Sequence, residues 1–133
     1  MIYSEKTCWK NRPYENEKPW GREVVWATLS GINGKLIFIN KGKSTSLKFY
    51  DRKDEVIFVR KGKVQIVWDN NSFDKDQELS KYSKVKLIEG DSFCIQAGCP
   101  YRIKAIQNSE IIEIGSCSNS AYTIIHDDYG REF

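Results

Sequence analysis

Short runs of alternating apolar and polar residues, separated by turn-forming residues about every ten positions, dominate the chain. No stretch sustains the 3.6-residue periodicity of an amphipathic helix. The pattern predicts an all-β sandwich or barrel. The strand-like runs cover residues 22–29, 36–40, 45–50, 55–69, 84–90, 92–98, 101–106, 109–117 and 122–128.

Turn residues predict how some of these strands connect. Asn33 and Gly34 lie between two apolar runs, which is a strong signal for a hairpin turn. Gly62 lies inside the run 55–69, where a glycine tolerates a positive φ, and it predicts a second turn. The polar residues 70–83 predict an exposed loop with a short helical turn.

Composition and charge limit the classes of partner. With 133 residues, of which 40% are hydrophobic, the chain suits one folded domain whose core needs no disulfides. The formal net charge is +3, and basic residues are interleaved with acidic ones. Nucleic-acid binding usually needs a stronger and more clustered positive charge, so we expect no nucleic-acid partner. The mild excess of positive charge is compatible with a small anionic ligand such as a sugar phosphate.

The start of the chain has no apolar segment typical of a secretory signal, and no run of ~18 apolar residues is present to span a membrane. We therefore expect a cytoplasmic protein without membrane contact. His126 is the only histidine, so one chain cannot supply two or three imidazoles to a site. The cysteines are expected to be free thiols, and their spacing fits no common zinc pattern: they are Cys8, Cys94, Cys99 and Cys117.

Four segments carry a resemblance to a known family. They are residues 17–23 (EKPWGRE), 41–62 (KGKSTSLKFYDRKDEVIFVRKG), 89–105 (EGDSFCIQAGCPYRIKA) and 124–132 (IIHDDYGRE). In this order they resemble the cupins, and more closely the cupin domain of type II phosphomannose (mannose-6-phosphate) isomerases. The resemblance implies a single cupin β-barrel, a jelly roll, at residues 18–133 after an irregular N-terminal arm at residues 1–17. It also implies a homodimer.

The sequence departs from that family at the metal site. The family's metal is held by three histidines and a glutamate, and the matching positions here are Tyr50, Arg52, Glu55 and Tyr101. We expect Arg52 to form a charge-assisted hydrogen bond with Glu55, because burying that carboxylate alone would cost several kcal/mol. Arginine does not ligate metals, so we expect no metal and no cofactor.

Strand pleating predicts which of these side chains share a pocket. Lys48 and Tyr50 alternate with Leu47 and Phe49, and Tyr101 alternates with Arg102. We expect Glu55, Tyr50 and Tyr101 to be the catalytic candidates, with Glu55 as the general base. The residues expected to bind a phosphate group at the same barrel mouth are Lys48, Arg52 and Arg131.

The alternatives for single residues stay open. Glu55 could form only an ion pair with Arg52 or Lys53, and the two tyrosines could simply fill the volume of the lost metal site. His126, beside two acidic residues, is either a general acid or a histidine without a catalytic role.

The expected ligand is a sugar phosphate or a nucleotide sugar, bound without the metal-dependent isomerase reaction. One alternative is a metal-free isomerase or epimerase that uses Glu55 with Tyr50, Tyr101 and Arg52. Another is a non-catalytic regulatory or structural cupin, and a third is a cupin whose cysteines hold a metal. A group in the pocket with a pKa near 7 would favour catalysis.

Overall fold

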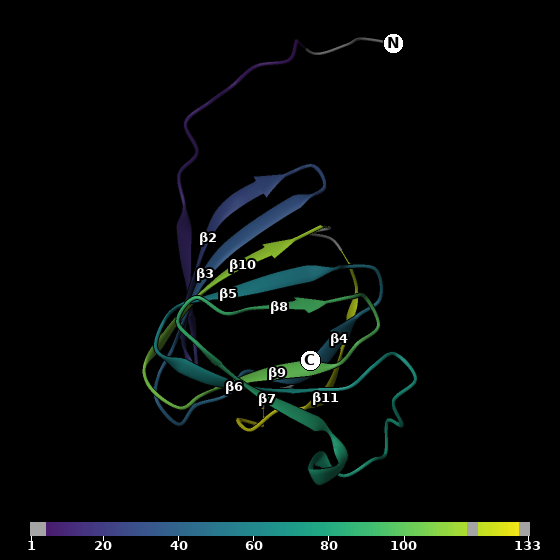
Figure 1. Ribbon diagram of the computed structural model, residues 1–133. Helices are drawn as coiled ribbons and strands as arrows, with labels where there is room; N and C mark the ends of the chain where they lie inside the picture. The colour runs from purple at the N-terminus through teal and green to yellow at the C-terminus, as the bar shows by residue number, and fades with distance from the viewer. Residues whose placement is uncertain (1–4, 117–119, 131–133) are drawn as a thin grey trace.

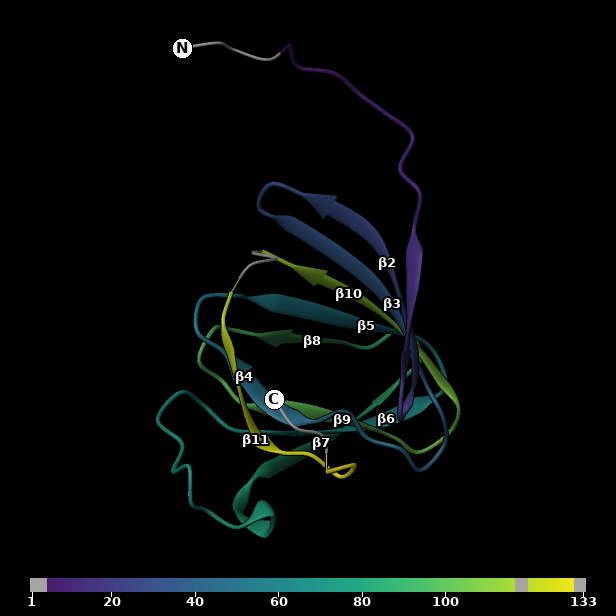
Figure 2. The same cartoon turned by 180° about the vertical axis from the view of Figure 1, so that it is seen from behind.

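Two antiparallel sheets face each other in this computed structural model, which describes residues 5–116 and 120–130 (Figures 1 and 2). The six-stranded sheet has the order β1-β2-β3-β10-β5-β8, and the five-stranded sheet has the order β11-β4-β9-β6-β7. The strands are β1 (Tyr14–Lys18), β2 (Gly21–Leu29), β3 (Ile32–Ile39), β4 (Leu47–Tyr50), β5 (Glu55–Lys61), β6 (Lys63–Trp68), β7 (Ser83–Ile88), β8 (Ser92–Ile95), β9 (Tyr101–Ala105), β10 (Ser109–Gly115) and β11 (Tyr122–His126).

The all-β prediction is confirmed. In the polar loop between β6 and β7 there is a single short helical turn, η1 (Leu79–Lys81), as the sequence predicted. None of the helical segments in residues 5–116 and 120–130 has the length and apolar character that crossing a membrane requires.

The core lies between the two sheets and follows the alternation of the strands. Ile37, Ile57 and Ile111 point inward from the six-stranded sheet, while Ile66 and Ile103 point inward from the other, and all are almost completely buried. Burying such apolar side chains supplies the main driving force for the fold. The charged residues described below replace apolar residues at inward positions near one end of this core.

The predicted turn between β2 and β3 is displaced. The register pairs Leu29 with Ile32, so the two-residue loop is Ser30–Gly31, and Gly31 has φ +78°. The prediction of an Asn33–Gly34 turn is therefore wrong, because both residues lie within β3. At Gly34 the indole ring of Trp26 packs so closely that a Cβ atom would approach its carbons to 2.7 Å. Gly34 is therefore needed for the close packing of the Trp26 ring and not for a turn.

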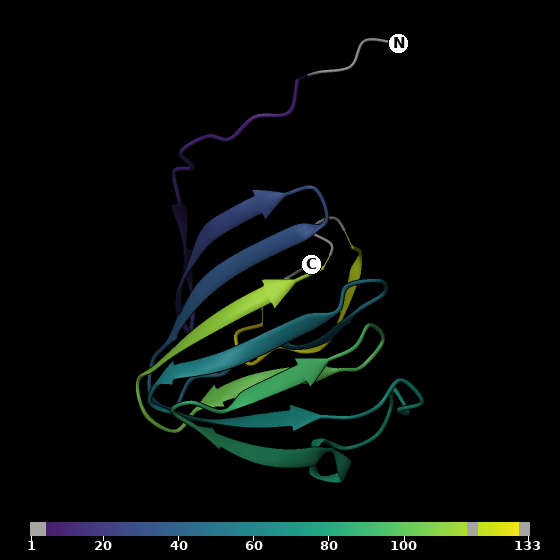
Figure 3. The same cartoon turned by 45° about the horizontal axis from the view of Figure 1, so that its top comes forward.

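The N-terminal segment extends away from the two sheets before the chain enters β1 (Figure 3). Residues 5–13 form no strand or helix and are exposed, although the Asn11 side-chain amide donates a hydrogen bond of 2.8 Å to the Trp26 carbonyl. The first strand begins at Tyr14, inside the range expected for the arm.

Candidate functional site

A cavity of about 180 Å³ opens between the two sheets. Its size lies below the ~300–1,000 Å³ of pockets that hold drug-sized ligands, which indicates a smaller ligand. Lysines, glutamates, hydroxyl groups and aromatic rings dominate its wall. The lining residues are Lys18, Trp20, Glu23, Lys35, Ile37, Thr45, Ser46, Lys48, Tyr50, Tyr101, Ile103, Glu113, Tyr122 and Ile124.

The six-stranded sheet contributes charged residues at inward positions of the strands. In the register of β3 and β10, Lys35 lies directly opposite Glu113. The Lys35 ammonium is 3.2 Å from Glu23 Oε2, and the Lys18 ammonium is 3.8 Å from Glu23 Oε1. Burial raises the pKa of Glu23, but Lys35, a hydrogen bond from Asn16 and Lys18 outweigh burial and hold that pKa below its ordinary value. Lys18 and Lys35 therefore have a carboxylate partner already.

Deeper in the site, the buried ammonium of Lys53 lies near two carboxylates. Its Nζ atom is 3.3 Å from Glu55 Oε2 and 3.9 Å from Glu113 Oε2, and the Lys53 side chain is 3% exposed. The Tyr101 hydroxyl donates a 2.7 Å hydrogen bond to Glu55 Oε1. The ring of Tyr50 lies 4.7 Å from the Lys53 ammonium. These contacts compensate charges that would be costly to bury alone.

Gly115 makes room for the Lys53 side chain. It lies opposite Glu55 in the register of β10 and β5. A Cβ atom on Gly115 would lie 2.3 Å from Lys53 Cε, closer than any real van der Waals contact. Since Lys53 is buried, its side chain has little space into which to move. The absence of a side chain at position 115 is thus part of how the buried lysine is held.

Glu113 has an altered acidity. Burial, the negative charge of Glu55 and a hydrogen bond with Glu55 raise its pKa from 4.5 to about 8, and Lys53 and Lys35 only partly oppose the shift. Close carboxylates rarely ionise together, so one of the pair holds a proton near neutral pH. The cavity therefore has a group that can gain or lose a proton in the physiological range.

The five-stranded sheet places Lys48 and two tyrosines on the opposite wall. The Lys48 ammonium lies 5.5 Å from the ring centroid of Tyr50 and 5.6 Å from that of Tyr122. Burial lowers the pKa of Lys48, against the charges of Glu113 and Glu55. Burial also raises the pKa values of Tyr50 and Tyr101, which keeps both phenols protonated. Lys48 makes no salt bridge with any residue that the structure describes.

Most of the predicted site residues converge. Lys48, Tyr50 and Tyr101 line the cavity, as strand pleating predicted, and Glu55 lies directly behind Tyr101. The expected pairing of Arg52 with Glu55 is wrong, because Arg52 is exposed and Lys53 makes the ion pair. Residues 53 and 55 are two apart and face the same side of the extended chain, whereas Arg52 faces the other.

The outcome differs for two further predicted residues. His126 is exposed and does not line the cavity, and its Nε2 atom is 3.0 Å from Asp128 Oδ1. Arg131 lies outside the residues that the structure describes.

Glu113, Lys35 and Glu23 were not predicted as site residues, and Lys53 was predicted only as an alternative ion-pair partner of Glu55. Glu113, Lys35 and Glu23 could have been recognised from the sequence. Each lies at an inward-facing position of a strand, two residues from an apolar residue that faces the core. Glu113 follows Ile111, Lys35 precedes Ile37, and Glu23 precedes Val25. Charged residues at core positions of a strand are rarely tolerated without partners, so several such positions indicate a polar site.

The residues present do not fit the metal site of the family that the sequence resembles. Within the described residues, no group of three or more histidines, cysteines, aspartates or glutamates comes together. The two carboxylates that do approach each other have the Lys53 ammonium beside them, and an ammonium group donates hydrogen bonds but does not ligate a cation. Cys8, Cys94 and Cys99 are free thiols, and Cys117 is outside the described residues.

Comparison with known proteins shows the fold. No protein-family model and no curated protein matches the chain. KdgF from Halomonas sp. is a similar solved structure, with a TM-score of 0.64, 15% identity, and coverage of 80% of this chain and 87% of that one. A point variant of oxalate decarboxylase from Bacillus subtilis has a TM-score of 0.69 at 11% identity, covering 82% of this chain but 28% of the larger protein.

A variant of salicylate 1,2-dioxygenase from Pseudoaminobacter salicylatoxidans is also similar, with a TM-score of 0.59, 15% identity, and coverage of 72% of this chain and 26% of that one. These are cupin-fold proteins. The chain is therefore a cupin-fold protein, a single all-β jelly-roll domain. At such low identity the likeness concerns the fold alone.

Proposed function

We propose that the cavity binds a small anionic sugar of the sugar-phosphate class, without a metal. The observation that carries this proposal is the environment of Lys48. Lys18, Lys35 and Lys53 each lie within 4 Å of a glutamate, whereas Lys48 lines the cavity beside two aromatic rings and has no salt bridge among the described residues. An ammonium group without a carboxylate partner is available to a phosphate group.

The charges of the whole site support an anionic ligand. Four lysines, Lys18, Lys35, Lys48 and Lys53, lie at the site with three glutamates, Glu23, Glu55 and Glu113. Because the pKa of Glu113 is raised to about 8, this carboxyl group is mostly protonated at pH 7, which increases the positive excess. An excess of one sign inside a cavity with low-dielectric walls favours ligands of the other sign.

The remaining lining groups suit a sugar ring. Thr45 and Ser46 supply hydroxyl groups, and Tyr50 and Tyr122 supply aromatic faces beside Lys48. The volume of about 180 Å³ favours a monosaccharide phosphate over a nucleotide sugar, whose nucleotide would have to remain outside the cavity.

Ligand-induced thermal stabilisation tests this proposal. Hexose 6-phosphates, hexose 1-phosphates, free hexoses and nucleotide sugars are compared, each with EDTA and with added divalent metals. A ligand at a hundredfold excess over its dissociation constant adds about 2.7 kcal/mol to the unfolding free energy, which gives a visible shift in Tm. We expect a shift with a hexose phosphate that survives EDTA. A shift that appears only with added metal, or none with any sugar phosphate, would refute the proposal.

A second candidate function is metal-free isomerisation or epimerisation, and Glu113 favours it. General acid–base catalysis is most efficient when the pKa of the catalytic group lies near the working pH. Glu113 meets this condition, and Tyr50 and Tyr101 are protonated phenols in the same cavity. In this reaction Glu113 would exchange the proton with the carbon next to the carbonyl group, and Lys48 would stabilise the oxyanion that develops.

Proton exchange into the sugar tests this second candidate. The hexose phosphate that binds best is incubated in D₂O with EDTA, and loss of its C2 proton signal is followed by NMR. We expect Glu113→Gln to slow the exchange by about 10²–10⁴-fold, the usual contribution of a general acid or base. If the wild type exchanges no proton, the chain is a binding protein and the second candidate fails while the first stands.

The membership of the phosphomannose isomerase-like cupins, the cytoplasmic location and the homodimer remain predictions. The outer face of the six-stranded sheet supports the dimer, since Val56, Phe58 and Ile114 are 43%, 40% and 51% exposed on the adjacent strands β5 and β10. Static light scattering that gives the mass of a monomer would refute it.

A further inference from the structure

We propose that the outer face of the five-stranded sheet carries a second binding site, for the phosphate group of a small phosphorylated compound. It is distinct from the inner cavity. A groove of about 240 Å³ lies there, between the sheet, the loop that contains η1 and the turn after β11. Its lining residues are Ser44, Gln65, Val67, Leu79, Ser80, Lys84, Arg102, Lys104 and Asp128.

Cations cluster on this face in a regular way. In the register of the sheet, Val67 on β6 lies between Arg102 on β9 and Lys84 on β7. Two residues further along the strands, Gln65 on β6 lies between Lys104 on β9 and Lys86 on β7. Residues two apart on a strand share a face, so these four cations project from the same side of β9 and β7, with β6 between the two strands.

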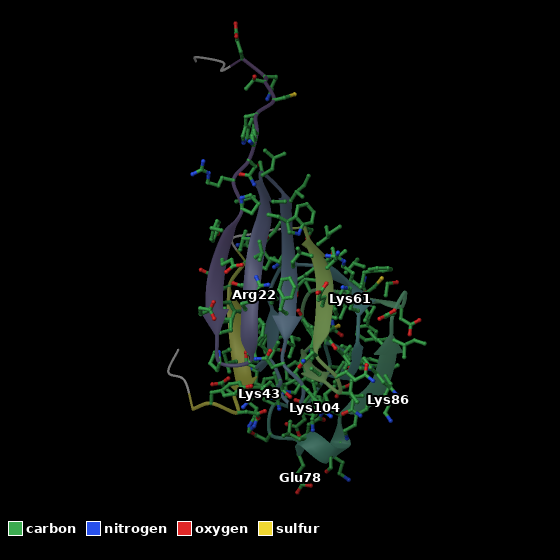
Figure 4. All side chains as sticks on the ribbon, turned by 90° about the vertical axis from the view of Figure 1, so that its left-hand side faces the viewer. Arg22, Lys43, Lys61, Glu78, Lys86 and Lys104 are labelled. Carbon is green, nitrogen blue, oxygen red and sulfur yellow. The ribbon has the colours of Figure 1, made fainter. Side chains whose placement is uncertain are left out.

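Figure 4 shows that side of the molecule edge-on, with Lys43, Lys104 and Lys86 following one another across its lower part and Glu78 below them. The described residues provide no salt bridge to Lys84, Lys86 or Lys104. Gathering like charges costs free energy, and a bound anion would offset that cost.

Arg102 gives the groove a fixed anchor. Its side chain is 8% exposed, and its Nε atom donates a 3.0 Å hydrogen bond to the Thr45 carbonyl oxygen. The Nη2 atom lies 3.0 Å from Asp128 Oδ1, yet this buried nitrogen makes no well-directed hydrogen bond. A guanidinium held in this way, with an Nη2 group that makes no directed hydrogen bond, is suited to donate one to a phosphate oxygen.

The other charged groups near the groove do not cancel its charge. Asp128 is shared between Arg102 and His126, whose Nε2 atom is also 3.0 Å from Asp128 Oδ1. Glu78 accepts a hydrogen bond of 3.4 Å from the Ser80 hydroxyl group. The groove thus keeps an excess of positive charge from Arg102, Lys84 and Lys104, with the hydroxyl groups of Ser44 and Ser80 at its wall.

An NMR titration with inorganic phosphate tests the proposal, with sodium chloride adjusted so that ionic strength stays constant. We expect saturable shifts of the backbone amides of residues 44, 84, 102 and 104. The double variant Lys84→Gln/Lys104→Gln should weaken this binding by about tenfold or more, because it removes two charge-assisted contacts. Both lysines are exposed, so the variant should fold normally.

Lys10→Gln is the matched control, since this exposed lysine lies in the N-terminal segment, and it should bind phosphate like the wild type. Lys48→Met separates the two sites, because it should leave the outer titration unchanged. Shifts confined to residues of the inner cavity would overturn this inference and leave the proposed function intact. Loss of affinity in Lys10→Gln, an absence of saturation, or tighter and strongly salt-dependent binding of a single-stranded oligonucleotide would also overturn it.

Discussion

Two lysines lie near the same ring, that of Tyr50, and their surroundings differ. The Lys53 ammonium, 4.7 Å from the ring centroid, is buried beside Glu55 and Glu113. The Lys48 ammonium, 5.5 Å from the same centroid, lines the cavity without a carboxylate partner among the described residues. Lys53 supplies a cation that holds the site together, whereas Lys48 supplies one that a ligand can use.

This comparison explains how a cupin-fold site is built here without imidazole groups. A buried carboxylate pair needs a positive charge nearby, and Lys53 provides it from within the chain. In the proposed function, the cavity gains its affinity for anions from a different lysine, Lys48 on the opposite sheet.

Removing Lys53 should destabilise the protein most. Lys53→Met leaves Glu55 and Glu113 buried without their ammonium partner, and breaking a buried pair in this way costs about 3–5 kcal/mol. Urea unfolding measures the loss, with Lys10→Met as the control for removing a lysine charge. If Lys53→Met does not fold, the triple variant Lys53→Met/Glu55→Gln/Glu113→Gln should recover folding. A loss no greater than that of the control would show that Lys53 has no structural role.

Tyr101→Phe should have the next largest effect. It removes the donor of the 2.7 Å hydrogen bond to Glu55 Oε1, and a hydrogen bond to a charged group contributes about 1.5–3 kcal/mol. Unfolding in urea compares Tyr101→Phe in the wild-type background and in Glu55→Gln. The two costs should differ, because the second background has lost the charged acceptor; equal costs would contradict the arrangement.

Gly115→Ala should act through Lys53. The added methyl group would lie 2.3 Å from Lys53 Cε, and overpacking of this kind costs about 1–3 kcal/mol. A double-mutant cycle with a shorter side chain, Lys53→Ala, provides the test. Gly115→Ala should cost much less in the Lys53→Ala background. An equal cost in both would place the clash elsewhere.

Glu113→Gln should leave stability almost unchanged below pH 4.5 and should stabilise the protein increasingly as the pH rises from there to about 8. The folded-state pKa of Glu113 is raised from 4.5 to about 8, so its stabilising contribution is complete below pH 4.5 and is lost as the pH rises through about 8. Glutamine stays neutral throughout. The Tm of the variant should therefore rise relative to wild type between pH 5 and pH 9. A constant difference over that range would mean that Glu113 does not titrate in it.

The fold was largely predictable because strand alternation and turn residues act locally. The position of Lys48 and Tyr50 on one face of β4, and of Tyr101 on the same face of the adjacent strand β9, followed from the same alternation. The turn at Ser30–Gly31 was missed, because Gly34 is needed for the ring of Trp26, which no local pattern reveals. Lys53 was only the second expected partner of Glu55, because the family's motif has a metal ligand at position 52, whereas the alternation of side chains puts Lys53 on the same side as Glu55.

Calorimetric titration of a hexose phosphate in EDTA measures whether Lys48 provides the anion contact of a metal-free cavity. The wild type and Lys10→Met should bind with the same affinity, and Lys48→Met should lose about tenfold or more, as expected for the loss of a charge-assisted contact. Equal affinity in Lys48→Met and wild type would show that Lys48 does not contact the anion, and binding that vanishes for all three proteins in EDTA would show that the cavity needs a metal.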